Sequence, residues 1–217
     1  MLLLFSIVFL SSIIIYNLYL YSKRESFIDN KNTNANVKNV ILLGDSTIKN
    51  NAYVKPTNSI EYLLHIELPN VNIYCLAKDG SNIKSVYKQL AKIPESLNID
   101  KTIIFLSVGG NDLLNKHSNV DTFFQEYTQL ISAIQHKLNK CKIVLLNLYI
   151  PPDLSKNIVT KIPQWNNKIQ LYTEKNNNNI GLIKLDTILN TPEDFVVYYE
   201  PSEVGGMKIV KAIRQHV

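Results

Sequence analysis

The sequence predicts an α/β protein in which a five-stranded parallel sheet lies between two layers of helices. Short apolar runs of the kind that form buried parallel strands alternate with helical patterns five times along residues 39–217. Two of these runs stop in small, turn-forming residues at the end of the expected strand. Repeated alternation of this kind favours right-handed crossovers and helices on both faces of one sheet.

The first expected strand covers residues 39–43 and ends in Gly44-Asp45-Ser46, and the third covers residues 102–108 and ends in Gly109-Gly110-Asn111-Asp112. The other expected strands are 72–77, 142–148 and 181–185. In open α/β sheets, ligands bind at the carboxyl ends of the strands, so both polar endings lie where chemistry is expected.

The expected helices lie between and after these strands, at 59–67, 82–93, 121–138, 164–175 and 203–215. The third has the clearest pattern, because Phe124, Tyr127, Ile131, Ile134 and Leu138 fall on one face. We expect Asp121 to cap its amino end.

The amino-terminal segment differs from the rest of the chain. No charged side chain occurs before Lys23, so residues 1–22 are long enough and apolar enough to be a transmembrane anchor. A cleaved signal peptide is the alternative, but a basic n-region and a clear cleavage site are absent. Residues 23–38 are polar and fit a flexible tether to a domain at 39–217. Lys23 and Arg24 favour a cytosolic domain.

Composition narrows the function classes. The formal net charge of +5 comes from lysines scattered along the chain, which does not predict a nucleic-acid interface. Cys75 and Cys141 stand in or beside apolar runs and are expected to be buried thiols rather than a disulfide framework. Zinc-ligand spacing, a phosphate loop and a dinucleotide fingerprint are all missing from the sequence, so no cofactor is expected.

Ser46 and Asn111 offer a hydroxyl group and an amide group at the same edge of the expected sheet. This pairing suggests a nucleophile and an oxyanion donor. Each residue also has a structural alternative, since Ser46 could cap the following segment and Asn111 could be a turn residue.

Together with Ala77-Lys78-Asp79-Gly80, these motifs resemble the SGNH (GDSL-type) hydrolase family over residues 39–217. The resemblance implies a flavodoxin-like three-layer sandwich, with Ser46 as the nucleophile. It also implies an oxyanion hole made by the backbone N–H groups of Ser46 and Gly80 and the side chain of Asn111. We expect Asp45 to brace the nucleophile turn and Asp112 to form hydrogen bonds at the same edge.

The last family motif, Asp-x-x-His, is altered. Val197 and Glu200 occupy the Asp and His positions, although Pro201-Ser202 follows as in the family. The chain resembles a subgroup with Glu-Pro-Ser in place of His-Pro-Ser. A free Glu has a pKa near 4.3, but an apolar environment from residues 196–199 would raise it. We therefore hypothesise that Glu200 is the base, helped by Asp194.

The histidines provide one alternative base. His65 and His136 lie in helical patterns, and His216 is expected to fray with the carboxyl terminus. His117 follows Asn111 in a loop near the proposed site and could replace Glu200.

The sequence thus predicts a membrane-anchored serine esterase or acylhydrolase acting on a small-molecule, lipid or glycan ester. Two alternatives remain: an acyltransferase to a glycan, and a catalytically silent domain that binds a ligand or partner at the membrane. The intact set of Ser46, Gly80 and Asn111 favours an enzyme, and the altered last motif favours the silent domain.

Overall fold

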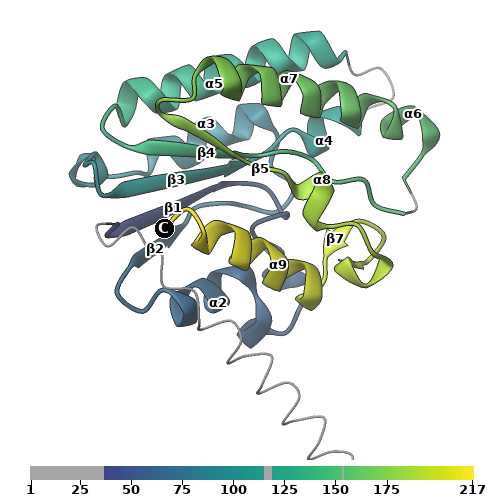
Figure 1. The fold of residues 1–217 in the computed structure, drawn as a ribbon, viewed down its shortest axis with the longest axis horizontal. Helices are drawn as coiled ribbons and strands as arrows, with labels where there is room; N and C mark the ends of the chain where they lie inside the picture. Colours follow the sequence, from purple (N-terminus) through teal and green to yellow (C-terminus); the bar gives the residue numbers. More distant parts are fainter. Residues whose placement is uncertain (1–36, 115–118, 153) are drawn as a thin grey trace, which may run out of the picture. The chain divides into compact units, whose positions relative to one another are not determined.

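The computed structural model describes residues 37–114, 119–152 and 154–217. Its main sheet has five parallel strands in the order β2-β1-β3-β4-β5 (Figure 1). The strands are β1 (Asn39–Gly44), β2 (Asn72–Cys75), β3 (Thr102–Ser107), β4 (Lys142–Leu146) and β5 (Ile180–Ile183). This is the strand order of flavodoxin-like folds, so the predicted α/β class and the five-stranded parallel sheet are confirmed.

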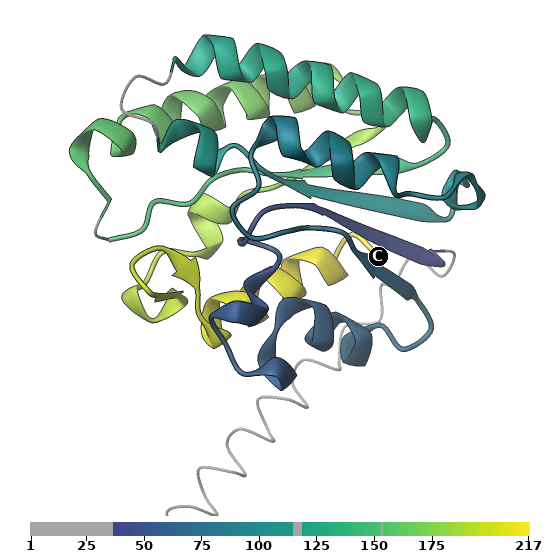
Figure 2. The ribbon, with the colours of Figure 1, turned by 180° about the vertical axis from the view of Figure 1, so that it is seen from behind.

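Helices cover both faces of this sheet, as Figures 1 and 2 show from opposite sides. One layer contains α3 (Ile83–Ala91), α5 (Val120–Lys137) and α7 (Lys161–Lys175). The other contains α2 (Ile60–Glu67) and α9 (Glu203–Arg214), which pack against each other.

The alternating side chains of β1 explain why two cores form. Ile41 and Leu43 belong to the core under α3, α5 and α7, whereas Val40 and Leu42 belong to the core under α2 and α9. Successive side chains of a strand point to opposite faces, so a continuous apolar run fills both layers. All four side chains are fully buried.

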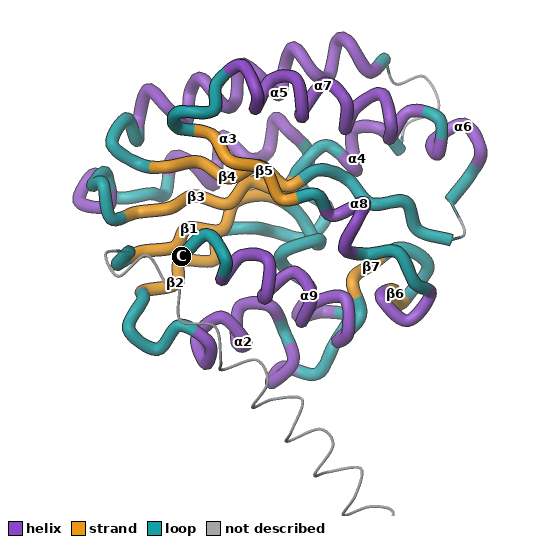
Figure 3. The backbone as a smooth tube through the Cα atoms, viewed as in Figure 1, coloured by secondary structure: helices purple, strands orange, loops and turns teal. Residues whose placement is uncertain are grey.

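Shorter elements occupy the carboxyl edge of the sheet and the connections (Figure 3). They include α4 (Gly110–Leu113), α6 (Lys156–Val159), α8 (Leu185–Ile188), and an antiparallel pair, β6 (Phe195–Val196) with β7 (Glu200–Pro201). The short 3-10 helices are Asn50–Ala52, Pro56–Asn58, Glu95–Leu97 and Pro192–Asp194. The β6–β7 pair was not predicted from sequence.

Two local expectations were wrong. Asp121 is not the cap of α5, because the side chain of Asn119 accepts a hydrogen bond from the Thr122 N–H at 3.0 Å. The carboxyl terminus does not fray either. His216 lies edge-on to Phe105, with ring centroids 6.3 Å apart, and Val217 is buried in the core under α9.

The expected anchor at 1–22 and nearly all of the expected tether at 23–38 lie outside the described residues. Within residues 37–217, as far as they are described, no helix has the length and apolar character needed to cross a membrane. Cys75 and Cys141 are free thiols, the first partly exposed and the second buried.

Candidate active site

The turn after β1 presents Ser46 at the carboxyl edge of the sheet. Gly44 has a φ of +133°, and a Cβ atom there would lie within 1.8 Å of the carbonyl oxygen of Ser107 on β3. Glycine therefore allows the backbone to turn away from β1 while it remains in close contact with the backbone of β3. The Asp45 N–H donates to Ser107 O at 3.0 Å, which fixes the start of the turn.

Glu200 reaches Ser46 from the far end of the chain. The Ser46 Oγ hydroxyl donates a hydrogen bond to Glu200 Oε1 at 3.1 Å, within the range expected of a nucleophile and its base. Glu200 stands on β7, where pairing with Val196 on β6 fixes its backbone. The sequence thus predicted a residue that the structure places beside Ser46.

The environment of Glu200 favours the protonated carboxyl group. Burial raises its pKa, the hydrogen bond from Ser46 lowers it, and the nearby charge of Asp79 raises it, with a net upward shift. Its second oxygen, Oε2, is buried and receives no hydrogen bond from any described residue. A carboxylate with one unsolvated oxygen is a stronger base than a free Glu.

The hairpin tip does not provide this burial, contrary to expectation. The side chains of Val197 and Tyr198 are 57% and 74% exposed. Both residues have left-handed backbones, with φ values of 47° and 68°. Such a conformation is costly for a β-branched residue, so the tip is a strained, exposed turn beside the site.

Asn111 lies in the first turn of α4 and contacts the loop that carries Gly80. Its Nδ2 donates to the carbonyl oxygen of Ser81 at 2.9 Å, and the other hydrogen of the same amide remains available for a ligand. Gly80 adopts a φ of +69° and precedes this carbonyl. Among the described residues, the backbone N–H groups of Ser46 and Gly80 have no hydrogen-bond acceptor.

Gln89 of α3 links the turn after β1 to the Gly80–Ser81 loop. Its Oε1 accepts from the Gly44 N–H at 2.8 Å, and its Nε2 donates to Gly44 O at 2.8 Å and to Ser81 Oγ at 3.0 Å. The side chain is buried. Sequence reasoning missed it, although Gln89 follows Val86 by three residues and so falls on the apolar stripe of its helix.

Asp45 and Asp112 organise this edge through backbone donors. Asp45 Oδ1 accepts from the Thr47 N–H at 3.0 Å, and burial raises the pKa of Asp45 to about 7. Both oxygens of Asp112 accept from the Ile83 N–H, at 3.3 and 3.1 Å, at the start of α3. Burial is also the main cause that raises the pKa of Asp112, to about 6.

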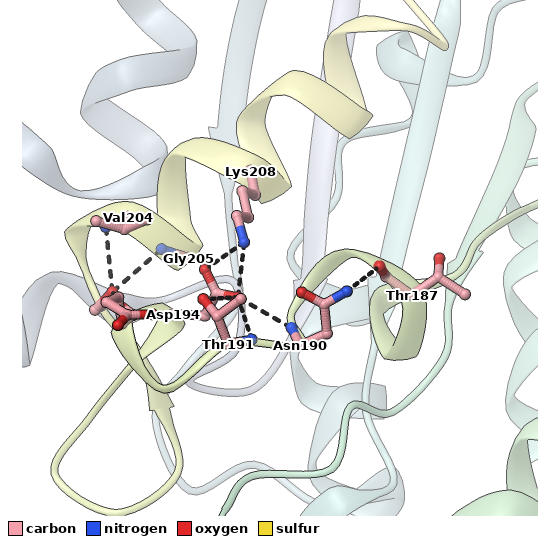
Figure 4. Close-up of polar contacts among 9 residues, drawn as sticks. Thr187, Asn190, Thr191, Asp194, Val204, Gly205 and Lys208 are labelled. Atoms are coloured by element: carbon pink, nitrogen blue, oxygen red, sulfur yellow. Dashed lines mark hydrogen bonds and ion pairs between the residues drawn. The ribbon is translucent and has the colours of Figure 1, made fainter.

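Asp194 has other partners than Glu200 (Figure 4). Its buried carboxylate accepts from the N–H groups of Asn190 and Thr191, each at 3.0 Å, and forms an ion pair with Lys208 at 2.7 Å. Burial raises its pKa, but the hydrogen bonds from Lys208, Thr191 and Asn190 lower it further than burial raises it. Asp194 thus links the segment before β6 to α9. Among the described residues, no hydrogen bond or ion pair joins Asp194 to Glu200, so the expected help to Glu200 is not seen there.

An open cavity lies at this edge, and about 70 Å³ of it is accessible to the centre of a water molecule. Ser46, Asn111 and Glu200 lie in its wall, together with Asp45, Tyr149 and Tyr199. The Tyr149 hydroxyl donates to the Tyr199 carbonyl oxygen at 2.8 Å, joining the hairpin to the segment after β4. Gly80 is not among the lining residues.

His117 lies outside the described residues. In the described part of the chain, no group of three or more His, Cys, Asp or Glu side chains is arranged to hold a metal ion. Among the described residues, the groups that could take part in chemistry at this edge are Ser46, Glu200, Asn111 and the backbone donors around them.

The family model described as the GDSL-like Lipase/Acylhydrolase family matches residues 42–203. Among curated proteins, no sequence matches the chain.

Solved structures share the fold at low sequence identity. A GDSL-family lipolytic protein from Veillonella parvula is 18% identical, with a TM-score of 0.66 over 83% of this chain and 97% of its own. The psychrotrophic esterase EstA from Pseudoalteromonas, in a structure inhibited by monoethylphosphonate, is 14% identical, with a TM-score of 0.64 over 82% and 95%. The acetyl xylan esterase AlAXEase is 19% identical, with a TM-score of 0.67 over 82% and 99%.

Proposed function

Because the chain belongs to the GDSL-like lipase/acylhydrolase family, we propose that it hydrolyses esters with Ser46 as nucleophile and Glu200 as base. The hydrogen bond of 3.1 Å between Ser46 Oγ and Glu200 Oε1 carries this proposal. It joins a hydroxyl group to a carboxylate whose pKa is raised, at the edge of the sheet where ligands bind. The Glu-Pro-Ser sequence is then a working variant of the last motif.

In the first step, Ser46 Oγ attacks the ester carbonyl carbon while its proton passes to Glu200. The negative charge that develops on the carbonyl oxygen is held by the N–H groups of Ser46 and Gly80 and by the free N–H of Asn111. The tetrahedral intermediate then collapses to the acyl-enzyme, and protonated Glu200 returns the proton to the leaving alcohol.

In the second step, Glu200 takes a proton from water, which attacks the acyl-enzyme. Collapse of the new intermediate releases the acid, and Ser46 recovers its proton from Glu200. A sugar hydroxyl in place of water would give acyl transfer to a glycan. Asp45 and Asp112 hold the turn and α3 in position during both steps and take no part in the proton transfers.

We also propose that residues 1–22 anchor the protein in a membrane and that the catalytic domain faces the cytosol. The absence of charge before Lys23 and the position of Lys23 and Arg24 after the apolar segment support this. Fractionation of cells that make the full chain tests it. The chain should stay with membranes in carbonate and resist protease added outside intact cells, and release by carbonate would contradict the anchor.

A fluorophosphonate probe applied to the full chain tests the nucleophile. We expect covalent labelling that disappears in Ser46→Ala and persists in Ser132→Ala, a matched change at an exposed serine of α5 that does not line the cavity. Labelling absent from pH 5 to pH 9 would overturn the enzyme proposal and favour a silent binding domain.

The pH dependence of kcat/KM tests the base. Glu200 must be ionised to accept the proton, so activity should rise with pH through the raised pKa of Glu200. Glu200→Gln should lower kcat by on the order of 10²–10⁴. Glu200→His should retain more activity and move the acid limb toward pH ~6.5. If the acid limb of the pH profile stays in place in Glu200→His, Glu200 is not the base. Replacing a residue with a purely structural role would leave that limb where it is.

A further inference from the structure

One wall of the cavity beside Ser46 is apolar and comes from elements that take no part in the proposed chemistry. Leu113 closes α4 and Leu114 follows it, Leu154 and Ile158 belong to the α6 region, and Ile162 lies in the first turn of α7. Leu148 and Pro151 complete this side. The cavity therefore continues from the reacting atoms into a hydrocarbon surface.

Part of this apolar surface is not covered by the described residues. Leu114 is 37% exposed, and Leu154 and Ile158 are half-buried although they pack against the main core cluster. Contiguous apolar surface inside a concave site commonly marks the place of an apolar ligand. Because this surface adjoins Ser46, an apolar group attached to the reacting carbonyl would lie against it.

Charge also limits what the cavity can hold. Of its described lining residues, only Asp45 and Glu200 are ionisable acids, both at the Ser46 end, and none is a lysine, arginine or histidine. Among the described lining residues, a phosphate or carboxylate group on the acyl chain would find no cation to pair with. An uncharged chain of methylene groups fits this wall better than a polar or anionic acyl group does.

We propose that the apolar wall formed by Leu113, Leu114, Leu154, Ile158 and Ile162 binds the acyl chain of the substrate and selects medium-length aliphatic acyl esters over acetyl esters. This inference rests on the proposed function, because it takes Ser46 as the attacking group. Family membership leaves the acyl group open, so the preference belongs to the side chains of this protein.

A series of p-nitrophenyl esters from acetate to decanoate, turned over by the full chain, measures the preference. Each methylene added should raise kcat/KM by up to about fourfold until the wall is covered. Ile158→Gln and Leu114→Gln should lower kcat/KM for the hexanoate ester by on the order of tenfold more than kcat/KM for the acetate ester. Both variants are measured so that, if one of them does not fold, the other still tests the apolar wall.

Leu171→Gln is the matched control. Leu171 lies on α7 with 57% of its side chain exposed and is not among the residues that line the cavity, so its change should affect no ester. A kcat/KM that falls as the chain lengthens beyond acetate would overturn the proposal. Equal loss on all esters in the two wall variants would overturn it as well, because that result indicates damage to the fold or to Ser46.

A binding measurement separates this proposal from the proposed function. Hexanamide and acetamide are neutral, and calorimetry reports their binding whether or not the protein turns over esters. Tighter binding of hexanamide than of acetamide, weakened in Ile158→Gln but not in Leu171→Gln, would support the acyl site even if fluorophosphonate labelling failed. Equal binding of the two amides would overturn the acyl site even if labelling succeeded.

Discussion

At the scale of single residues, Asp45 combines full burial with few compensating contacts. Its carboxyl group accepts a hydrogen bond from the Thr47 N–H, and burial outweighs this contact and raises the pKa from 3.8 to about 7. The folded protein therefore keeps the Asp45 proton up to about pH 7, whereas the unfolded chain releases it near pH 4. Asp45 binds more protons in the folded state over this interval.

Asp45→Asn should show this as a pH-dependent difference in stability. Because the unfolded chain releases the proton first, the stability that Asp45 contributes is fully present below pH ~4 and is lost as the pH rises to about 7. Relative to that of Asp45→Asn, the unfolding free energy of the natural protein should fall by roughly 4 kcal/mol across this interval. Above about pH 7 it should fall no further. Urea unfolding at several pH values measures the difference, with Asp100→Asn as the control for net charge. If the difference in unfolding free energy between the natural protein and Asp45→Asn does not change with pH, the pKa of Asp45 is not raised in the folded state.

Gln89 is a positioning residue, because it touches Gly44 and Ser81 and not the reacting atoms. Gln89→Met keeps the side-chain length but leaves the Gly44 N–H and carbonyl groups without these partners. We expect a loss of about 2–3 kcal/mol in unfolding free energy, and a fall in kcat with little change in KM.

The control for Gln89 is Gln164→Met, at an exposed position of α7. It should change stability by less than about 0.5 kcal/mol. The acid limb of the pH profile should stay in place in Gln89→Met, since Glu200 is untouched. A kcat equal to that of the natural protein would show that the link between the two loops is dispensable for catalysis.

The sequence predicted the nucleophile turn and the partner of Ser46, but not the residues that hold them. Ser46, Asn111 and Glu200 belong to motifs that can be read locally. Gln89 acts through contacts with Gly44, 45 residues away in sequence, and no local pattern reports such a contact. The apolar wall of the cavity was missed for a similar reason, since leucine and isoleucine in helical patterns are typical of any core.

At the scale of elements, the carboxyl ends of β1 and β3 approach each other closely, and this approach depends on Gly44. Gly44→Ala would place a methyl group within 1.8 Å of Ser107 O, in a backbone conformation with φ of +133° that L side chains avoid. We expect the unfolding free energy of Gly44→Ala to be lower by more than about 3 kcal/mol, as measured by urea or thermal unfolding.

Gly181→Ala, in β5, is the matched control for Gly44. A Cβ atom at Gly181 would meet Val144 Cγ2 at 3.4 Å, an ordinary contact. The change should alter stability by less than about 1 kcal/mol. Equal effects of the two substitutions would mean that the close approach of β1 and β3 is not the cause.

The hairpin of β6 and β7 is the element that the sequence did not predict. Two-residue strands carry too little periodicity to be recognised. Its turn also contains Val197 and Tyr198 with positive φ, where turn rules call for glycine or asparagine. The structure holds this unfavourable turn through Asp194, Lys208 and the Tyr149–Tyr199 hydrogen bond.

At the scale of the whole molecule, the sheet and both helical layers follow from the periodicity of the sequence. Apolar strand runs and amphipathic helices are local features, so their order gave the class of fold directly. The residues at element ends were less predictable. Asn119 rather than Asp121 caps α5, because both are good capping residues and only the packing of the helix decides between them.

Ser46 and Glu200 are separated by 154 positions along the polypeptide, and Glu200 lies on β7, which contacts α9. Under the proposed mechanism, a nascent chain on the ribosome exposes the Ser46 hydroxyl group long before the carboxylate that would activate it has been added. Translation would then delay the chemistry, and the proposal predicts that fragments released before Glu200 is added do not hydrolyse esters of the cell that makes them.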